Sequence, residues 1–210
     1  MLDILFEKNP GSACVLSCYT MTARYFFPEV NFDRIAEISD WHPGYVVWGF
    51  KFWLWMMGKG IKITEYDLLD LSLWAEQGIE GLKNSISEKE YNFIISKTKD
   101  INSYSDDIRK VLNHPNFTFK KQKPTWEDLE KAFREGAVCE AVLDSKTLNG
   151  QVGFALHRVV VLDIDNDDKK ITFHDPSKTN PKPAKEESID LFKKAWLDSL
   201  EDPELCVYKK

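Results

Sequence analysis

The stretch that decides the fold reads LHRVVVLDI at residues 156–164 and ITFHDP at residues 171–176. Both segments are rich in β-branched residues, and the polar run DNDDKK between them has turn chemistry, so they predict a β-hairpin. With the turn centred near Asn166, His157 and Asp175 fall opposite one another. Directly opposed residues share a face with Cβ atoms about 4.5–5.5 Å apart, which predicts a hydrogen bond between the imidazole and the carboxylate.

A histidine oriented by an acid forms two members of a nucleophilic triad. The alternative interpretation is a satisfied polar pair inside a sheet, since buried polar groups are normally hydrogen-bonded. A slip of one residue in the strand register would turn the two side chains to opposite faces. The catalytic interpretation therefore depends on whether the rest of the chain supplies a nucleophile.

The composition favours one globular domain and excludes some partners. The chain has 210 residues, of which 43% are apolar, and a formal net charge of −6. An acidic chain without a basic stripe is a poor binder of nucleic acid, which requires Lys and Arg against the phosphates. The longest aromatic and apolar run, residues 46–57, contains Lys51 and is shorter than the roughly 20 residues that span a bilayer. We expect no nucleic-acid or membrane partner, and the oligomeric state stays open.

The four cysteines do not follow a zinc-ligand or disulfide-scaffold spacing. Cys139 and Cys206 lie inside apolar strand-like runs, where a buried reduced thiol is expected. Together with the absence of a secretory signal at residues 1–7, this favours a reducing compartment and a cytoplasmic protein. No cofactor is expected.

A metal site is the weaker alternative for the residues around the hairpin. His157, Asp175 and His174 are metal-ligating residue types. However, His174 alternates to the other face of its strand from Asp175, so the three side chains converge only through a bulge. The sequence therefore predicts no metal site.

The nucleophile candidate is Cys14. Residues 13–27 predict a helix with Ser12 as N-cap, and Pro28 ends it. Cys14 stands in the first turn, where the helix dipole and unpaired N–H groups favour a thiolate. The alternative is that Cys14 is a small apolar residue on a buried stripe, as Cys18 is expected to be one turn later.

The remaining elements give an α+β class, with helices first and an antiparallel sheet last. Residues 67–114 carry a charge-rich helical pattern and predict a helical insert that covers or gates a site. Trp48 and Trp53 belong to an aromatic run that either packs in the core or lines a substrate groove. The other expected elements are helices at 31–38, 46–57, 126–135 (capped by Thr125) and 188–200, strands at 61–66, 117–120, 137–143 and 205–208, and loops at 144–153 and 176–187.

At this point the chain resembles the papain-like cysteine peptidases of the bacteriocin-leader-processing type and their free-standing relatives. The resemblance rests on motif order at both ends of the chain. Near the start it is CVLSC at residues 14–18, followed by Met21 and the Tyr-Phe pair at 25–26. Near the end it is LHRVVV at residues 156–161 and HDP at residues 174–176. The resemblance implies a papain-like fold with Cys14, His157 and Asp175 as the catalytic triad.

The chain departs from the family pattern at two places. The Gly-Pro that follows the nucleophile in the family is Val15-Leu16 here. The upstream Gln that helps form the oxyanion hole would fall at Lys8 or Asn9. The resemblance therefore implies Lys8 or Asn9 as oxyanion donor, together with the backbone N–H of Cys14.

The implied function is a cysteine peptidase or amidase acting on a peptide or small amide substrate. Two alternatives stay open. One is a catalytically weak or inactive papain-fold binding protein, which the two departures favour. The other is a small-molecule acyltransferase or amidohydrolase, which a closed pocket would favour.

Overall fold

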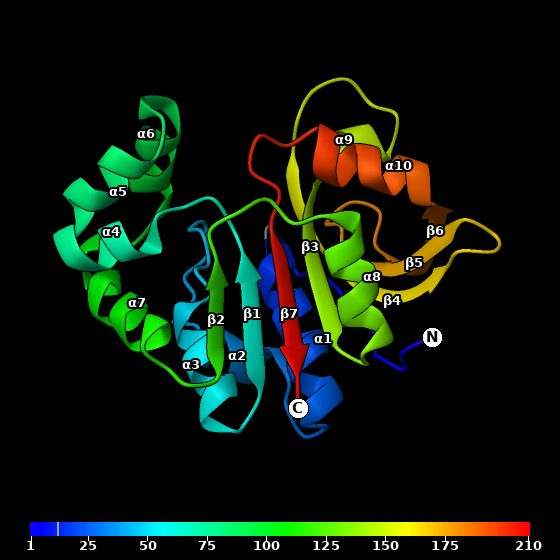
Figure 1. The fold of residues 1–210 in the computed structure, drawn as a ribbon, viewed down its shortest axis with the longest axis horizontal. Helices are drawn as coiled ribbons and strands as arrows, with labels where there is room; N and C mark the ends of the chain where they lie inside the picture. Colours follow the sequence, from blue (N-terminus) through cyan, green and yellow to red (C-terminus); the bar gives the residue numbers. More distant parts are fainter. Residues whose placement is uncertain (12) are drawn as a thin grey trace.

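The computed structural model describes residues 1–11 and 13–210, with the backbone alone at residues 89 and 90. It is an α+β fold built on a seven-stranded sheet with the strand order β2-β1-β7-β3-β4-β5-β6 (Figure 1). The strands are β1 Lys62–Tyr66, β2 Phe117–Lys120, β3 Val138–Asp144, β4 Leu156–Asp165, β5 Lys170–Asp175, β6 Lys182–Ser188 and β7 Leu205–Lys209.

The prediction of an antiparallel sheet is wrong for one pair of neighbouring strands. β1 and β2 are parallel, whereas the other neighbouring strands are antiparallel. Parallel neighbours require a crossover connection of a dozen residues or more. The helical section between β1 and β2 supplies that crossover, so the sheet is mixed.

The hairpin of β4 and β5 forms, but its register differs from the one expected. Asp165 pairs with Lys170, and the register shifts between Val161 and Asp163. This pairing centres the turn beyond Asn166. Within the turn, Asp165 Oδ1 accepts the N–H groups of residues 167 and 168. Beyond the bulge Val161 pairs with Phe173, and continuing that register sets Asp175 across from residue 159.

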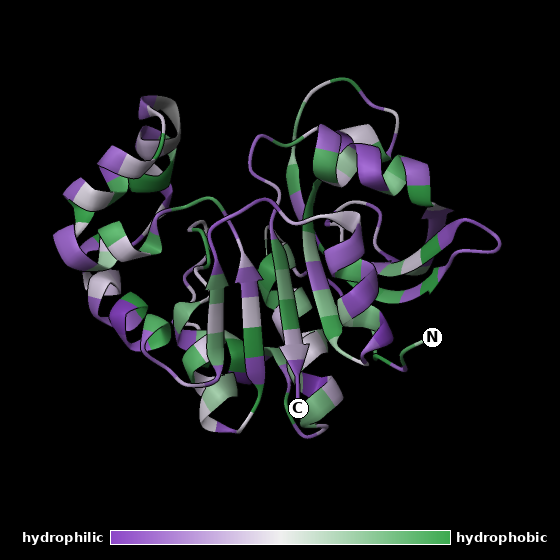
Figure 2. Cartoon of the chain, viewed as in Figure 1, coloured by the Kyte–Doolittle hydropathy of each residue, from purple (hydrophilic) through white to green (hydrophobic). Residues whose placement is uncertain are grey.

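Helices cover both faces of the sheet. On one side α1 (Cys14–Phe26), α2 (Phe32–Ile38) and α3 (Phe50–Gly58) contribute to a hydrophobic cluster with Val160 and Leu162 of β4. On the other side α8 (Trp126–Arg134), α10 (Ile189–Lys193) and the π-helical turn η2 (Lys194–Asp198) pack with the alternate residues 159 and 161. Figure 2 shows apolar residues along the central strands, as expected for strands buried on both faces.

The section between β1 and β2 is helical, as predicted. Its helices are α4 Leu71–Gln77, α5 Ile79–Ser85, α6 Glu88–Lys97, the 3₁₀ turn η1 Ile101–Ser103 and α7 Tyr104–Leu112. They extend outward from the β2 edge of the sheet, where α7 packs against α3 and α4 packs against α7 (Figure 1). In the described part of the chain, no helix is both long and apolar enough to cross a membrane.

Two expected loops contain regular structure. Residues 182–188, expected as part of a Pro- and Lys-rich loop, form the edge strand β6. An edge strand tolerates Pro183 and charged residues because one of its sides needs no ladder partner. The loop after β3 contains the short helix α9, Ser145–Leu148.

Helix boundaries follow the capping residues. Thr125 and Asp128 form the capping box at the start of α8, and Asn31 accepts the N–H of residue 34 at the start of α2. Phe50, not residue 46, begins α3. The expected cap Ser12 lies outside the described residues.

Candidate functional site

Cys14 lies in the first turn of α1, as the sequence predicts, although the helix begins at Cys14 and not at residue 13. The chain reaches it through a turn in which Asn9 Oδ1 accepts the N–H groups of Gly11 and Ala13, at 2.8 and 3.0 Å. Asn9 is buried, with 5% of its surface exposed, so this turn is fixed. N–H groups in the first turn of a helix have no intrahelical acceptor, which leaves the Cys14 N–H available to a ligand.

His157 and Asp175 are hydrogen-bonded, although they are not directly opposed. The distance from His157 Nε2 to Asp175 Oδ1 is 2.7 Å, and both residues are buried. Asp175 Oδ1 also accepts the N–H of Ser177 at 3.0 Å. The strand register makes this a diagonal pair: His157 lies two residues from the position across from Asp175, hence on the same face.

The environment of His157 favours the imidazolium. Burial lowers the pKa of His157, but the hydrogen bond to Asp175 and the contact with Cys14 outweigh it and raise the pKa to about 9. Because Asp175 holds Nε2, Nδ1 is the ring nitrogen left for the thiol. A histidine with this pKa is protonated at neutral pH when a negative charge stands beside it.

The thiol of Cys14 lies beside the His157 ring, close enough for each group to shift the pKa of the other. Burial raises the pKa of Cys14, yet the hydrogen bond and charge of His157 and the backbone N–H of Arg158 bring it below its ordinary value. The two shifts have the same cause, because each group stabilises the charged form of the other. The arrangement supports a thiolate–imidazolium pair.

The other cysteines are not activated. All cysteines among the described residues are free, and Cys18, Cys139 and Cys206 are buried. Burial raises the pKa of each of these three thiols. Cys18 donates to the Arg158 carbonyl at 3.2 Å. Cys18 therefore packs α1 against β4, as expected for a buried stripe, and Cys14 differs from it through its contact with His157.

The structural role of Arg158 was not predicted from the sequence. This residue of β4 follows His157 and makes buried contacts with neighbouring elements. Its guanidinium contacts Glu140 at 3.3 Å and Glu204 at 2.5 Å, and lies over the ring of Tyr19. Glu140 in turn accepts from Thr22 of α1 at 2.5 Å. This buried network connects α1, β3 and β4, the elements that place Cys14 beside His157. The signal was an arginine inside an otherwise apolar strand, since such a charge requires partners.

His174 is separate from the candidate site. Its Nε2 donates to the Ile4 carbonyl at 2.6 Å, and its Nδ1 accepts the N–H of Ala184 at 3.1 Å. Burial lowers the pKa of His174, so the ring is neutral. As its alternation predicted, His174 does not join His157 and Asp175; it anchors the N-terminal segment to β5 instead.

The two candidate oxyanion donors differ in placement. Lys8 is exposed, whereas Asn9 is buried beside the start of α1. Because Asn9 Oδ1 is held by two backbone N–H groups, the orientation of its amide is fixed. Of the two, Asn9 has the restrained amide donor that an oxyanion site requires.

Trp53 lies in the aromatic core, and Trp48 is partly buried against it. The Trp53 indole donates to Tyr208 at 3.3 Å and is 5% exposed. Trp48 packs against Phe50 and Trp74, and its indole donates to Thr98. Of the two roles expected for this aromatic run, packing in the core is the one observed for Trp53, which offers little surface to a substrate groove.

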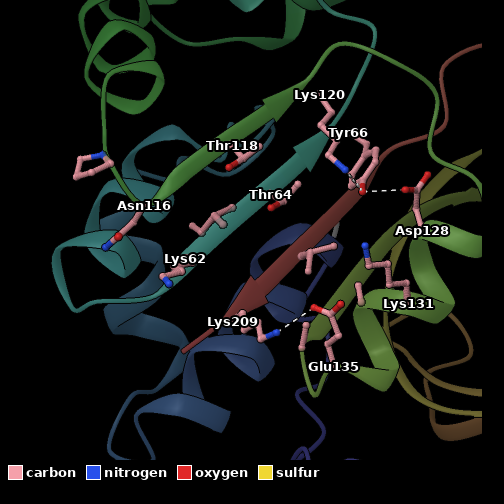
Figure 3. Close-up of a pocket in the computed structure, with 15 residues that line it drawn as sticks. Lys62, Thr64, Tyr66, Asn116, Thr118, Lys120, Asp128, Lys131, Glu135 and Lys209 are labelled. Carbon is pink, nitrogen blue, oxygen red and sulfur yellow. Dashed lines mark hydrogen bonds and ion pairs between the residues drawn. The ribbon is translucent and has the colours of Figure 1, made fainter.

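A hollow of about 320 Å³ lies elsewhere, on the exposed face of β2, β1 and β7 beside α8 (Figure 3). Lys209 pairs there with Glu135, and Lys120 donates to the Tyr66 hydroxyl. No cysteine or histidine is among its lining residues. The hollow is thus distinct from the Cys14 site.

Comparisons with known proteins do not assign the chain. No protein-family model matches it, and no curated protein matches it. The evidence for a function therefore comes from the side chains of this protein and their arrangement.

Proposed function

We propose that this protein is a cysteine peptidase or amidase with a papain-like fold, in which Cys14, His157 and Asp175 act as the catalytic triad. The observation that carries the proposal is the 2.7 Å hydrogen bond between His157 and Asp175, together with a Cys14 thiol close enough to the His157 ring for each group to shift the pKa of the other. The lowered pKa of Cys14 and the raised pKa of His157 support it.

The first step is attack on an amide carbonyl. The thiolate of Cys14, whose proton resides on His157, forms a bond to the carbonyl carbon. The carbonyl oxygen becomes an oxyanion, which the Cys14 backbone N–H and the Asn9 amide would stabilise. His157 then gives its proton to the leaving nitrogen, and the carbon–nitrogen bond breaks to leave a thioester.

The second step regenerates the enzyme. His157, now neutral, takes a proton from water as the water oxygen attacks the thioester carbonyl. Collapse of the intermediate expels the Cys14 thiolate and releases the acid. Asp175 holds Nε2–H throughout, which keeps Nδ1 directed at the thiol and stabilises the imidazolium. The substrate is a peptide or a small amide.

The arrangement of the elements also supports the proposal. The nucleophile stands at the start of a long helix, and the histidine and acid lie on two strands of the sheet against which that helix packs. A thiol on a helix and a histidine on a distant sheet is the division of residues that papain-like enzymes use.

The test is the pH dependence of Cys14 alkylation by iodoacetamide. Rapid modification at about pH 6, well below an ordinary thiol pKa of about 8.5, is expected for a thiolate–imidazolium pair. His157→Ala should abolish the rapid reaction, whereas His42→Ala, which changes a partly exposed histidine elsewhere, should not. Cys14→Ser identifies the labelled residue. Alkylation that rises only near pH 8.5 and ignores His157→Ala would overturn the proposal.

A further inference from the structure

The hollow beside α8 carries an excess of positive charge. In the part of the chain that the structure describes, its charged lining residues are the cations Lys62, Lys120, Lys131 and Lys209 and the acids Asp128 and Glu135. The chain as a whole has a formal net charge of −6. A concave patch of the opposite sign on such a chain favours an anionic ligand.

The sheet holds two of these lysines against each other. Lys62 of β1 is paired directly with Lys209 of β7 in the antiparallel register. Directly opposed residues project from the same face, and like charges in this position destabilise a sheet. Figure 3 shows Lys62 and Lys209 on neighbouring strands, with Lys131 and Glu135 facing them from the side of α8. Three ammonium groups therefore gather around one carboxylate.

That carboxylate does not balance the charge of the three lysines. Lys209 pairs with Glu135 at 3.0 Å, and the hydrogen bond and charge of Lys209, with the charge of Lys131, lower the pKa of Glu135. The other acid, Asp128, already accepts from the Tyr66 hydroxyl and takes part in the capping box of α8. Two positive charges are left over at the Lys62 end of the hollow.

This charge and the size of the hollow together indicate the class of ligand. A phosphate monoester carries about −1.5 to −2 charges near pH 7 and has three strong acceptor oxygens. A volume of about 320 Å³ lies at the lower end of the range for small-molecule sites, roughly 300–1,000 Å³. The directly opposed Thr64 and Thr118 line the hollow next to Val207, so hydroxyl donors and an apolar surface are both available to the organic part of a ligand.

We propose that this hollow binds a small molecule that carries a phosphate monoester, with the phosphate placed between Lys62, Lys131 and Lys209. The phosphate supplies the negative charge that the opposed lysines lack, and the lysines donate to its oxygens as point charges. This inference is independent of the proposed function, because none of these residues belongs to the Cys14 site.

The test is the binding of phenyl phosphate to the full chain at about pH 8, where the phosphate is a dianion, followed by amide NMR. Saturable shifts are expected at Thr64 and Thr118. Phenyl sulfate, which carries a single charge, should bind at least about fivefold more weakly. Lys62→Gln and Lys131→Gln should each weaken the binding of phenyl phosphate about fivefold.

Two further variants make the test specific. Lys83→Gln, which removes an exposed lysine from α5, is the matched control and should leave binding unchanged. Glu135→Gln removes the carboxylate that competes with the ligand for Lys209, so phenyl phosphate should bind about fivefold more tightly. Loss of folding cannot produce a tighter complex.

The proposal is wrong if phenyl phosphate causes no saturable shifts, if phenyl sulfate binds equally well, or if the lysine variants and Glu135→Gln leave binding unchanged. Shifts that gather around His157 instead would place the anion elsewhere and would also overturn it. A phosphoserine peptide that binds more tightly than phenyl phosphate would replace the small molecule with a phosphorylated protein segment. Alkylation of Cys14 at about pH 6 tests the proposed function separately from all of these results.

Discussion

His157 Nε2 and Asp175 Oδ1 lie 2.7 Å apart across a diagonal of the β4–β5 hairpin. The Cβ atoms of a diagonal pair lie farther apart than those of a directly opposed pair. The histidine side chain is long enough to span this greater distance and reach the carboxylate. The bond leaves Nδ1 for Cys14. The orientation of the histidine thus depends on one carboxylate, which makes that carboxylate the first target for mutation.

Asp175→Asn should lower the pKa of His157. Burial already lowers it, and the hydrogen bond to Asp175 is the largest opposing effect, followed by the contact with Cys14 and the charge of Asp175. Without the carboxylate the value is expected to fall from about 9 toward the ordinary value of about 6.5, while Cys14 continues to oppose the effect of burial. Titration of the His157 ring by NMR measures this. Asp165→Asn, at the exposed turn of the same hairpin, should leave the titration unchanged; an unchanged value in Asp175→Asn would contradict the pairing.

The pH dependence of stability should differ between the wild type and Cys14→Ser. The pKa of His157 is raised to about 9, so its contribution is complete below about pH 6.5 and is lost as the pH rises through about 9. The pKa of Cys14 is lowered, so its contribution is present above the pKa of the unfolded thiol and is lost as the pH falls through the folded pKa. In the pH range where both groups titrate, the loss of stability from His157 and the gain from Cys14 have opposite signs. In the wild type the two pH dependences therefore cancel.

We therefore expect the free energy of unfolding of Cys14→Ser to fall with pH above about 6.5, relative to the wild type, by up to about 1.4 kcal/mol per pH unit. Asp175 still raises the pKa of His157 in that variant. Urea unfolding across this pH range measures the difference. Adding His157→Gln should remove the slope, and a slope that survives would have to come from another group.

Glu140→Gln should destabilise the fold by about 3 kcal/mol, because removal of one partner leaves a buried charge without compensation. Glu140 is fully buried and contacts both Arg158 and Thr22. Exchanging Glu140 and Arg158 together for apolar residues of similar size should cost less than the sum of the single changes. Urea unfolding of the wild type, the two single apolar variants and the double apolar variant gives this double-mutant cycle. Glu135→Gln, which alters the exposed pair with Lys209, is the control and should have no measurable effect.

Asn9→Asp separates the structural and catalytic roles of Asn9. The aspartate retains the oxygen that accepts the Gly11 and Ala13 N–H groups but lacks the amide donor. Under the proposed function, acylation by p-nitrophenyl acetate should fall about 10²–10³-fold, the usual cost of an oxyanion donor. Iodoacetamide alkylation, which forms no oxyanion, should change much less and reports any effect of the added charge on the thiolate.

Lys8→Ala is the matched control for that experiment, since Lys8 is exposed and adjacent in the sequence. Acylation should be close to that of the wild type. If Lys8→Ala and not Asn9→Asp removed acylation, the donor would be the ammonium group and the assignment of Asn9 would be wrong.

Local patterns determined most of the secondary structure. The helix that begins at Cys14, the capping box at Thr125 and the β-branched arms of the hairpin depend on neighbours within a few residues, and all three were predictable. The same holds for the helical pattern of the insert. Alternation within a strand also predicted that His174 would turn away from Asp175.

Other features depended on distant parts of the chain. The Asp165 side chain and the bulge near Val161 set the hairpin register, and the parallel pairing of β1 and β2 depends on how the insert returns to the sheet. Strand β6 was expected as a loop because its sequence has no strand pattern. It forms at the edge of the sheet, where hydrogen bonds to a single neighbouring strand are enough to hold it.

By itself the sequence determined the chemistry available to this protein: a thiol at a helix start, an imidazole and a carboxylate on one hairpin. Only the tertiary structure decided that the Cys14 thiol lies beside the hydrogen-bonded pair of His157 and Asp175, because packing of α1 on β4 joins positions 140 residues apart. The buried network of Arg158 and Glu140 was likewise decided by tertiary structure, since a charge inside a strand is stabilised only by partners that folding brings to it.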